Sequence, residues 1–197
     1  MLLDNEIYVF DNFIDIKYQE DIKNILMGDY QYKKEDFPWH YIEDVTSSGD
    51  DDSQHRSALA HQYVEYIDGD SIGKKLTIFH HLFLDMLKKV CRKMVIKNIN
   101  VLQGRSFLQF PLNLKDRTVD TPHIDIYDRK HIVALYYVCD SDGDTIIYNE
   151  RKESESYTIK QRVTPKQGRM VVFDGWLMHT AEQPLNNVRC VVNYNLG

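Results

Sequence analysis

The sequence has few cysteines, and those present do not form a recognisable framework. Cys91, Cys139 and Cys190 are odd in number and far apart, which excludes a disulfide scaffold and the paired spacing of a structural zinc site. No apolar run reaches the length that a membrane-spanning helix needs. The first residues carry Asp4 and Glu6 rather than the positive and then apolar pattern of a secretion signal. We therefore predict a cytoplasmic protein with reduced thiols and no membrane association.

Basic residues are fewer than acidic ones. The chain has 24 lysines and arginines against 30 aspartates and glutamates, a formal net charge of −6, with the two signs interspersed. This balance disfavours bulk electrostatic binding to nucleic acid. Hydrophobic residues make up 43% of the 197 residues and aromatic residues 12%. A chain of this length and composition is expected to form one domain, residues 1–197, with a sizeable core rich in strands.

The expected elements change in character along the chain. Residues 6–13 read as a short strand, and residues 15–28 as a helix with Asp15 as its N-cap. An apolar stripe at helical spacing predicts a second helix over residues 76–93. Strand-like patterns then follow one another at short spacing. The strands are expected at residues 61–66, 99–110, 131–138, 145–148, 157–159, 168–173 and 189–195.

This order of elements indicates the fold class. We predict an α+β, mainly β protein, with helices of an N-terminal part (residues 1–98) packed on one sheet of a sandwich or barrel (residues 99–197). The Asp142-Gly143 pair between two expected strands is typical of a hairpin turn. The loops at residues 40–60 and 113–121 are expected to wall the mouth of any pocket in this core.

The chemistry is expected around the sequence Pro122-His123-Ile124-Asp125. Side chains two residues apart in an extended segment point to the same face, so His123 and Asp125 can bind one ion. His179 follows a strand-like run and can supply a third ligand. Two imidazoles and one carboxylate, with an open coordination face, are the ligands of non-haem Fe(II) oxygenases, although zinc or nickel could occupy the same ligands.

The downstream residues extend this pattern to a known family. Arg189 follows His179 at the head of an expected strand. Three further stretches, at residues 135–138, 142–145 and 168–175, lie between His123 and His179. Together with His123-x-Asp125 they resemble the iron(II)- and 2-oxoglutarate-dependent dioxygenases, within them the prolyl-4-hydroxylase-like branch. The resemblance covers about the last hundred residues well and the N-terminal half loosely. It implies a double-stranded β-helix, or jelly roll.

The resemblance also implies a role for each matching residue. His123, Asp125 and His179 would hold Fe(II), Arg189 would pair with the distal carboxylate of 2-oxoglutarate, and the Tyr137 hydroxyl would help to hold that carboxylate. The implied reaction hydroxylates a protein side chain, such as proline, or a small molecule, and converts 2-oxoglutarate and O2 to succinate and CO2. A planar guanidinium suits this cofactor because it binds a carboxylate through two parallel hydrogen bonds.

Two departures from the family pattern concern the substrate. The turn reads Asp-Gly-Asp-Thr at residues 142–145, where many prolyl hydroxylases have Gly-Gly-Glu-Thr, and Val191 replaces the serine of an Arg-x-Ser pattern. The upstream residue that completes the cofactor pocket is open between Gln103, Gln109 and Asn113. The metal ligands therefore match the family, whereas a prolyl substrate does not follow from the motifs.

Two other functions fit part of the pattern. A cupin-like metal-binding jelly roll with different chemistry would have no need of Arg189. A non-catalytic binding module would typically lose a metal ligand or the arginine, and both are retained here. His80 and His81 are interpreted as structural or exposed histidines, and His131 as a structural residue or an outer neighbour of the metal ligands, rather than as ligands. The aromatic patch at residues 37–41 is interpreted as packing, and the acidic run at residues 49–53 as a solvated loop.

Overall fold

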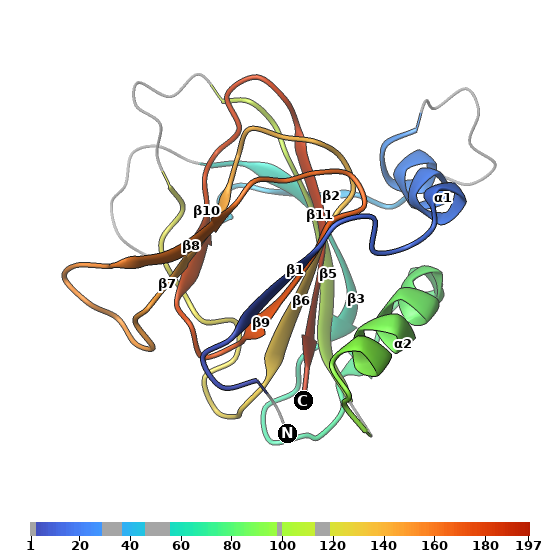
Figure 1. The fold of residues 1–197 in the computed structure, drawn as a ribbon. Coiled ribbons are helices and arrows are strands. Elements are labelled where there is room, and N and C mark those ends of the chain that lie inside the picture. The colour runs from blue at the N-terminus through green and yellow to red at the C-terminus, as the bar shows by residue number, and fades with distance from the viewer. Residues whose placement is uncertain (1–2, 29–36, 46–55, 98–99, 113–118) are drawn as a thin grey trace.

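The computed structural model describes residues 3–28, 37–45, 56–97, 100–112 and 119–197 (Figure 1). These residues form two antiparallel sheets, one of eight strands in the order β1-β9-β6-β11-β5-β3-β2, with β4 paired to β3, and one of three in the order β10-β7-β8. The strands are β1 (Ile7–Phe10), β2 (His40–Ile42), β3 (Ala58–Glu65), β4 (Lys74–Lys75), β5 (Val101–Gln109), β6 (Ile132–Tyr137), β7 (Thr145–Tyr148), β8 (Ile159–Val163), β9 (Met170–Asp174), β10 (His179–Ala181) and β11 (Arg189–Leu196). The mainly β, jelly-roll prediction is confirmed.

The helices cover the face of the larger sheet that points away from the smaller one (Figure 1). They are α1 (Ile16–Met27), the 3₁₀ helix η2 (Ile78–Phe83) and α2 (Leu84–Lys93). Asp15 caps α1 by accepting a hydrogen bond from the Tyr18 backbone N–H at 3.0 Å, as predicted. No helix among the described residues is both long enough and apolar enough to cross a membrane.

Strand β6 lies at the centre of the fold and is buried on both faces. Ala134 and Tyr136 pack with the core under the helices, whereas Leu135 and Tyr137 pack in the second core, which includes residues of β7 and β8. Alternate residues of a strand point to opposite faces, so one run of apolar residues supplies both cores. Val133 and Leu135 of β6 also line the cavity that the polar residues of β5, β10 and β11 face.

The hairpin predicted at Asp142-Gly143 is wrong. Strands β6 and β7 lie in different sheets, so residues 138–144 cross between the sheets rather than reversing within one. The Asp142 carboxylate accepts hydrogen bonds from the backbone N–H groups of residues 185–187, and Gly143 does not adopt the positive φ that a hairpin turn of this type requires. The Asp-Gly pair therefore fastens the loop before β11.

Two element boundaries also differ from the prediction. The apolar stripe at residues 76–93 begins as the 3₁₀ helix η2, in which His80 and Phe83, three residues apart, both lie buried. The strand expected at residues 157–159 is β8, displaced toward the C-terminus, and its residues are mostly polar. Arg162 on β8 pairs with Asp144 and Glu182, and such pairs carry no apolar signal in the sequence.

Gly104 in β5 is required by close packing against Tyr194. A Cβ at this position would lie 2.3 Å from the Tyr194 ring, which is fully buried. We expect Gly104→Ala to lower the free energy of unfolding by roughly 2 kcal/mol or more, because overpacked cores must move backbone or leave a rotamer minimum. Gly69→Ala is the control, because a Cβ at this position meets open space. Its only expected cost is about 1 kcal/mol for holding alanine at the left-handed φ of +82°. If urea denaturation gives the same loss of unfolding free energy for both variants, close packing against Tyr194 is not the reason for glycine at position 104.

His80 makes folding stability depend on pH. Its Nδ1 lies 3.0 Å from the Tyr194 hydroxyl, and burial, with Lys75 acting in the same direction, lowers the pKa of His80 to about 4. The unfolded chain binds this proton near its ordinary pKa of about 6.5. Neutral His80 therefore makes its full contribution to the free energy of unfolding above about pH 6.5, and this contribution is lost as the pH falls toward 4. We expect the thermal midpoint to fall less in His80→Gln than in the wild type over this range; equal falls would contradict the role of His80.

Candidate metal centre

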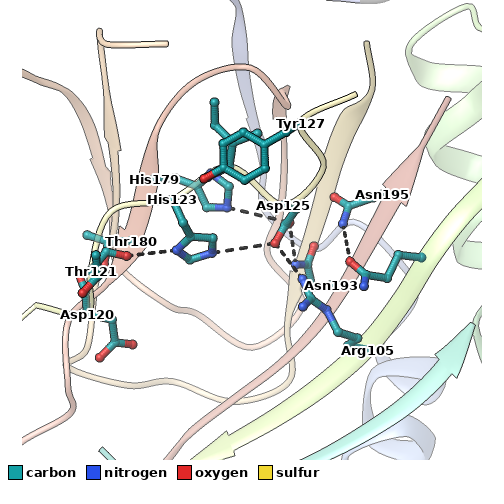
Figure 2. A network of polar contacts seen from close by, with 12 residues as sticks. Arg105, Asp120, Thr121, His123, Asp125, Tyr127, His179, Thr180, Asn193 and Asn195 are labelled. Atoms are coloured by element: carbon teal, nitrogen blue, oxygen red, sulfur yellow. Dashed lines mark hydrogen bonds and ion pairs between the residues drawn. The ribbon is translucent and has the colours of Figure 1, made fainter. Parts of the chain in front are cut away.

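The side chains of His123, Asp125 and His179 point toward one another (Figure 2). His123 and His179 are joined by reciprocal backbone hydrogen bonds of 3.0 Å each. Asp125 follows His123 by two residues, and the candidate ligand atoms of all three side chains lie within 4.8 Å of one another. The structure thus brings together the three residues that the sequence singles out.

The hydrogen bonds of both imidazoles orient their second nitrogen toward this centre. Nδ1 of His123 donates to the Thr121 carbonyl and Nδ1 of His179 to the Leu177 carbonyl, each at 3.0 Å. A carbonyl only accepts, so the proton lies on Nδ1 and each Nε2 carries a free lone pair. The Nε2 atoms lie 3.7 and 3.8 Å from the two oxygens of Asp125, too long for hydrogen bonds. This donor set fits a borderline divalent transition metal.

The protonation states of the buried ligands suit metal binding. The Asp125 side chain is only 2% exposed. Burial acts to raise the pKa of Asp125, but Arg105, His179 and His123 outweigh it and hold this pKa well below its usual range. Burial, followed by the effect of His123, lowers the pKa of His179 to about 4. At neutral pH the centre therefore offers an ionised carboxylate and a neutral buried imidazole.

A cavity of about 110 Å³ extends from these ligands toward Arg189. The Arg189 side chain is buried and donates to the Gly143 carbonyl at 3.1 Å, to Gln109 Oε1 at 2.8 Å and to Thr145 Oγ1 at 2.8 Å. A guanidinium has five N–H groups. These contacts use three, so two remain for an anion in the cavity.

Asp120 places a second buried carboxylate near this arginine. It accepts hydrogen bonds from Gln183 at 2.8 Å and from Gln109 at 3.3 Å, and it pairs with Arg56 at 3.7 Å. Burial raises the pKa of Asp120 even though Gln183, Arg189 and Arg56 oppose this shift. Asp120 and Arg189 both line the cavity, and Arg56, which pairs with Asp120, is not among its lining residues.

Tyr137 lies behind the cavity rather than in its wall. Its hydroxyl donates to Thr145 Oγ1 at 2.7 Å, and its ring lies beneath the Arg189 guanidinium, with 6.0 Å between the ring centroid and Cζ. Thr145 lines the cavity, as does Gln109. Of the other upstream candidates, Gln103 accepts a hydrogen bond from Asn195, and Asn113 lies outside the described residues.

Directly paired residues of strands β5 and β11 form part of the cavity wall. Arg189 pairs with Gln109, Val191 with Phe107 and Asn193 with Arg105. Positions two apart on a strand share a face, so each of these pairs points inward. The sequence predicts Arg189 and offers Gln109 as one candidate, but Arg105, Asn193 and Thr145 are not among the residues that it predicts for the site. The inward positions of both strands hold apolar as well as polar residues, so only the register between the strands identifies these side chains as cavity residues.

Among the described residues, His131 and the residues of the aromatic patch do not line this cavity, whereas Phe107 and Phe173 do. His131 is buried, and its Nδ1 lies 3.1 Å from the Arg129 carbonyl. Phe37 packs edge-on against Trp39 and His61, which confirms packing for this part of the aromatic patch. Of the loops expected at the cavity mouth, Val45 from the first and Asp120 from the second line the cavity, whereas residues 46–55, with the acidic run, and 113–118 lie outside the described residues.

Comparisons with known proteins relate this geometry to solved structures. No protein-family model matches the sequence, and no curated protein does so either. The chain is similar in structure to an oxidoreductase of the 2OG-Fe(II) oxygenase family from Burkholderia pseudomallei, with a TM-score of 0.70, 9% identity, and coverage of 97% of this chain and 84% of that one.

Two further structures show the same similarity. A prolyl-4-hydroxylase from Pseudomonas putida has a TM-score of 0.58 and 11% identity over 98% of this chain and 92% of its own. HygX from Streptomyces hygroscopicus, solved with nickel, 2-oxoglutarate and hygromycin B, has a TM-score of 0.55 and 14% identity over 98% and 83%. The fold is therefore the jelly roll of the 2-oxoglutarate-dependent oxygenases, and the resemblance seen in the sequence is confirmed at the level of the fold.

Proposed function

We propose that this chain is an Fe(II)- and 2-oxoglutarate-dependent dioxygenase that hydroxylates an organic substrate, with O2 as its second substrate. One observation carries the proposal: the cluster of His123, Asp125 and His179 lies at one end of a cavity and Arg189 at the other. We further propose that residues 1–197 form one catalytic domain. In support of this, β1 and β3 from the N-terminal half pair with β9 and β5 in the same sheet.

Each site residue has a role that follows from its contacts. His123, Asp125 and His179 would hold Fe(II) through Nε2 and carboxylate oxygens. Arg189 would bind the distal carboxylate of 2-oxoglutarate with its two remaining N–H groups, oriented by Gln109 and Thr145. Tyr137 would act through Thr145. When bound, Fe(II) and 2-oxoglutarate supply the oxidising chemistry, in which 2-oxoglutarate and O2 become succinate and CO2 while a substrate C–H bond is hydroxylated.

The solved structures support the same cofactors. The HygX structure holds nickel and 2-oxoglutarate in a fold similar to this one, which is consistent with a metal and a keto acid sharing the cavity here. A cupin-like protein with other chemistry gives no reason for a buried arginine at the far end of the cavity. A non-catalytic module gives no reason for three ligand side chains already oriented by their own hydrogen bonds.

The deciding experiment detects the metal and the keto acid together. Fe(II) and 2-oxoglutarate are added to the metal-free protein without oxygen, and the weak visible charge-transfer band of the chelated keto acid is recorded. We expect the band in the wild type and not in Asp125→Ala. Iron binding without the band would favour the cupin-like function, and absence of iron binding would favour a binding module.

A further inference from the structure

Two buried polar atoms beside the metal ligands have no hydrogen-bond partner among the residues that the structure describes. They are Nε of Arg105 and Oδ1 of Asn193. Arg105 and Asn193 are directly paired across β5 and β11, and both line the cavity. Buried polar groups without partners are rare in folded proteins, and each one needs an explanation. Here one donor and one acceptor lie side by side in a cavity wall, which indicates a ligand that supplies their complements.

The identity of each unpaired atom is fixed by the contacts of its neighbour. Nδ2 of Asn193 donates to Asp125 Oδ2 at 3.1 Å, so the free atom of this amide is the acceptor oxygen. Nη2 of Arg105 lies 2.6 Å from Asp125 Oδ1, which leaves Nε and the rest of the guanidinium edge as donors. The missing partner must therefore combine an acceptor for Arg105 with an N–H or O–H donor for Asn193.

The charge near Asp125 points to an anionic acceptor. Arg105 forms an ion pair with Asp125, and a divalent cation would draw on the same carboxylate oxygens. A largely buried guanidinium that shares its counter-ion with a metal is strongly stabilised by a second carboxylate. The Arg105 side chain is 26% exposed, whereas that of Asp125 is 2% exposed. Since Nε is itself enclosed, the exposed part of Arg105 that an incoming carboxylate reaches first is the rest of its side chain, and Nε lies behind that contact.

We propose that Arg105 and Asn193 recognise the α-carboxylate and the α-amino group of a free amino acid, which would be the substrate. This inference rests on the proposed function. A carboxylate next to an ammonium supplies both missing partners from one small group. An internal residue of a protein chain carries no such anion, so a side chain within a polypeptide would leave Arg105 without its second partner.

Nuclear magnetic resonance of added amino acids tests this inference. Mn(II) replaces Fe(II), 2-oxoglutarate is present, and oxygen is excluded. The standard l-amino acids and their primary amides are then screened for paramagnetic relaxation of the α-proton. We expect at least one amino acid to bind, and its amide to bind roughly 10-fold more weakly or worse, because a charge-assisted bidentate contact is lost.

Variants separate recognition from positioning of the metal ligand. Arg105→Gln is expected to weaken the amino acid by roughly 10-fold or more, and Arg105→Lys to restore part of the affinity. Arg92→Gln, an exposed arginine on α2, is the matched control and should change nothing. Mn(II) and 2-oxoglutarate affinities are measured for every variant. If Arg105→Gln weakens only Mn(II), Arg105 merely clamps Asp125, and if it weakens only 2-oxoglutarate, Arg105 serves the keto acid; either result overturns the inference.

The wild-type titration distinguishes this inference from the proposed function. Mn(II) and 2-oxoglutarate binding without relaxation of any amino acid would overturn the amino-acid inference and leave the proposed function standing. Failure to bind Mn(II) and 2-oxoglutarate would overturn both. Binding of an amino acid that Arg105→Gln abolishes would support both.

Discussion

His179→Ala is expected to abolish Fe(II) binding and, with it, all turnover of 2-oxoglutarate. Removing an outer partner of a metal ligand already lowers metal affinity by roughly 10- to 100-fold, so losing one of three ligands should cost more than ~100-fold. The His179 side chain is also pre-oriented by its bond to the Leu177 carbonyl. No other histidine among the described residues lines the cavity apart from His123, so no neighbour can replace it.

The control for this variant must separate metal binding from folding. His61 is equally buried, with Nδ1 2.8 Å from the Pro38 carbonyl, but it lies in the core under the helices. His61→Ala should lower the thermal midpoint and leave Fe(II) affinity unchanged. His179→Ala should abolish Fe(II) affinity and leave the thermal midpoint of the metal-free protein nearly unchanged. Fe(II) binding by calorimetry without oxygen gives the first quantity. Retention of wild-type affinity in His179→Ala would remove His179 from the metal centre.

Strands β5 and β11 show how much of the site the sequence could predict. His123 and Asp125 were found because their spacing alone places both on one face, and Arg189 because it heads a strand after the second histidine. Asn193 and Arg105 lie on strands that were also predicted, yet their pairing depends on the register between β5 and β11. Register is a property of two strands that lie far apart in the sequence. Neither strand alone reveals which polar residues face the cavity.

The crossing at residues 138–144 shows the other limit. The Asp142-Gly143 pair carries the local signal of a hairpin, but the competing partner for Asp142 is a loop more than forty residues later. That contact moves β7 into the smaller sheet and brings Thr145 into the cavity wall, in front of Tyr137. A tertiary contact therefore overrides the local turn preference, and Thr145 rather than Tyr137 lines the cavity.

Arg189→Ala is expected to weaken 2-oxoglutarate by ~100-fold or more and to leave metal affinity nearly unchanged. Two hydrogen bonds from a buried cation to a carboxylate contribute about 3 kcal/mol or more together, and ~100-fold corresponds to about 2.7 kcal/mol. The metal ligands do not contact Arg189, whose three side-chain hydrogen bonds go to Gly143, Gln109 and Thr145. Titration of 2-oxoglutarate into the Mn(II)-loaded protein measures both quantities.

Arg189→Ala also leaves Gln109 and Thr145 without a buried partner, so some loss of stability will accompany it. Arg189→Lys keeps the charge and should retain an intermediate 2-oxoglutarate affinity, because a point charge cannot form two parallel hydrogen bonds.

Tyr137→Phe is the sharper comparison. Since the Tyr137 hydroxyl reaches Thr145 and not the cavity, it should weaken 2-oxoglutarate only a few-fold. A loss in Tyr137→Phe as large as in Arg189→Ala would mean that Tyr137 contacts the keto acid directly. Unchanged affinity in Arg189→Ala would place the distal carboxylate elsewhere, with Arg56 beside Asp120 as the next cation to replace.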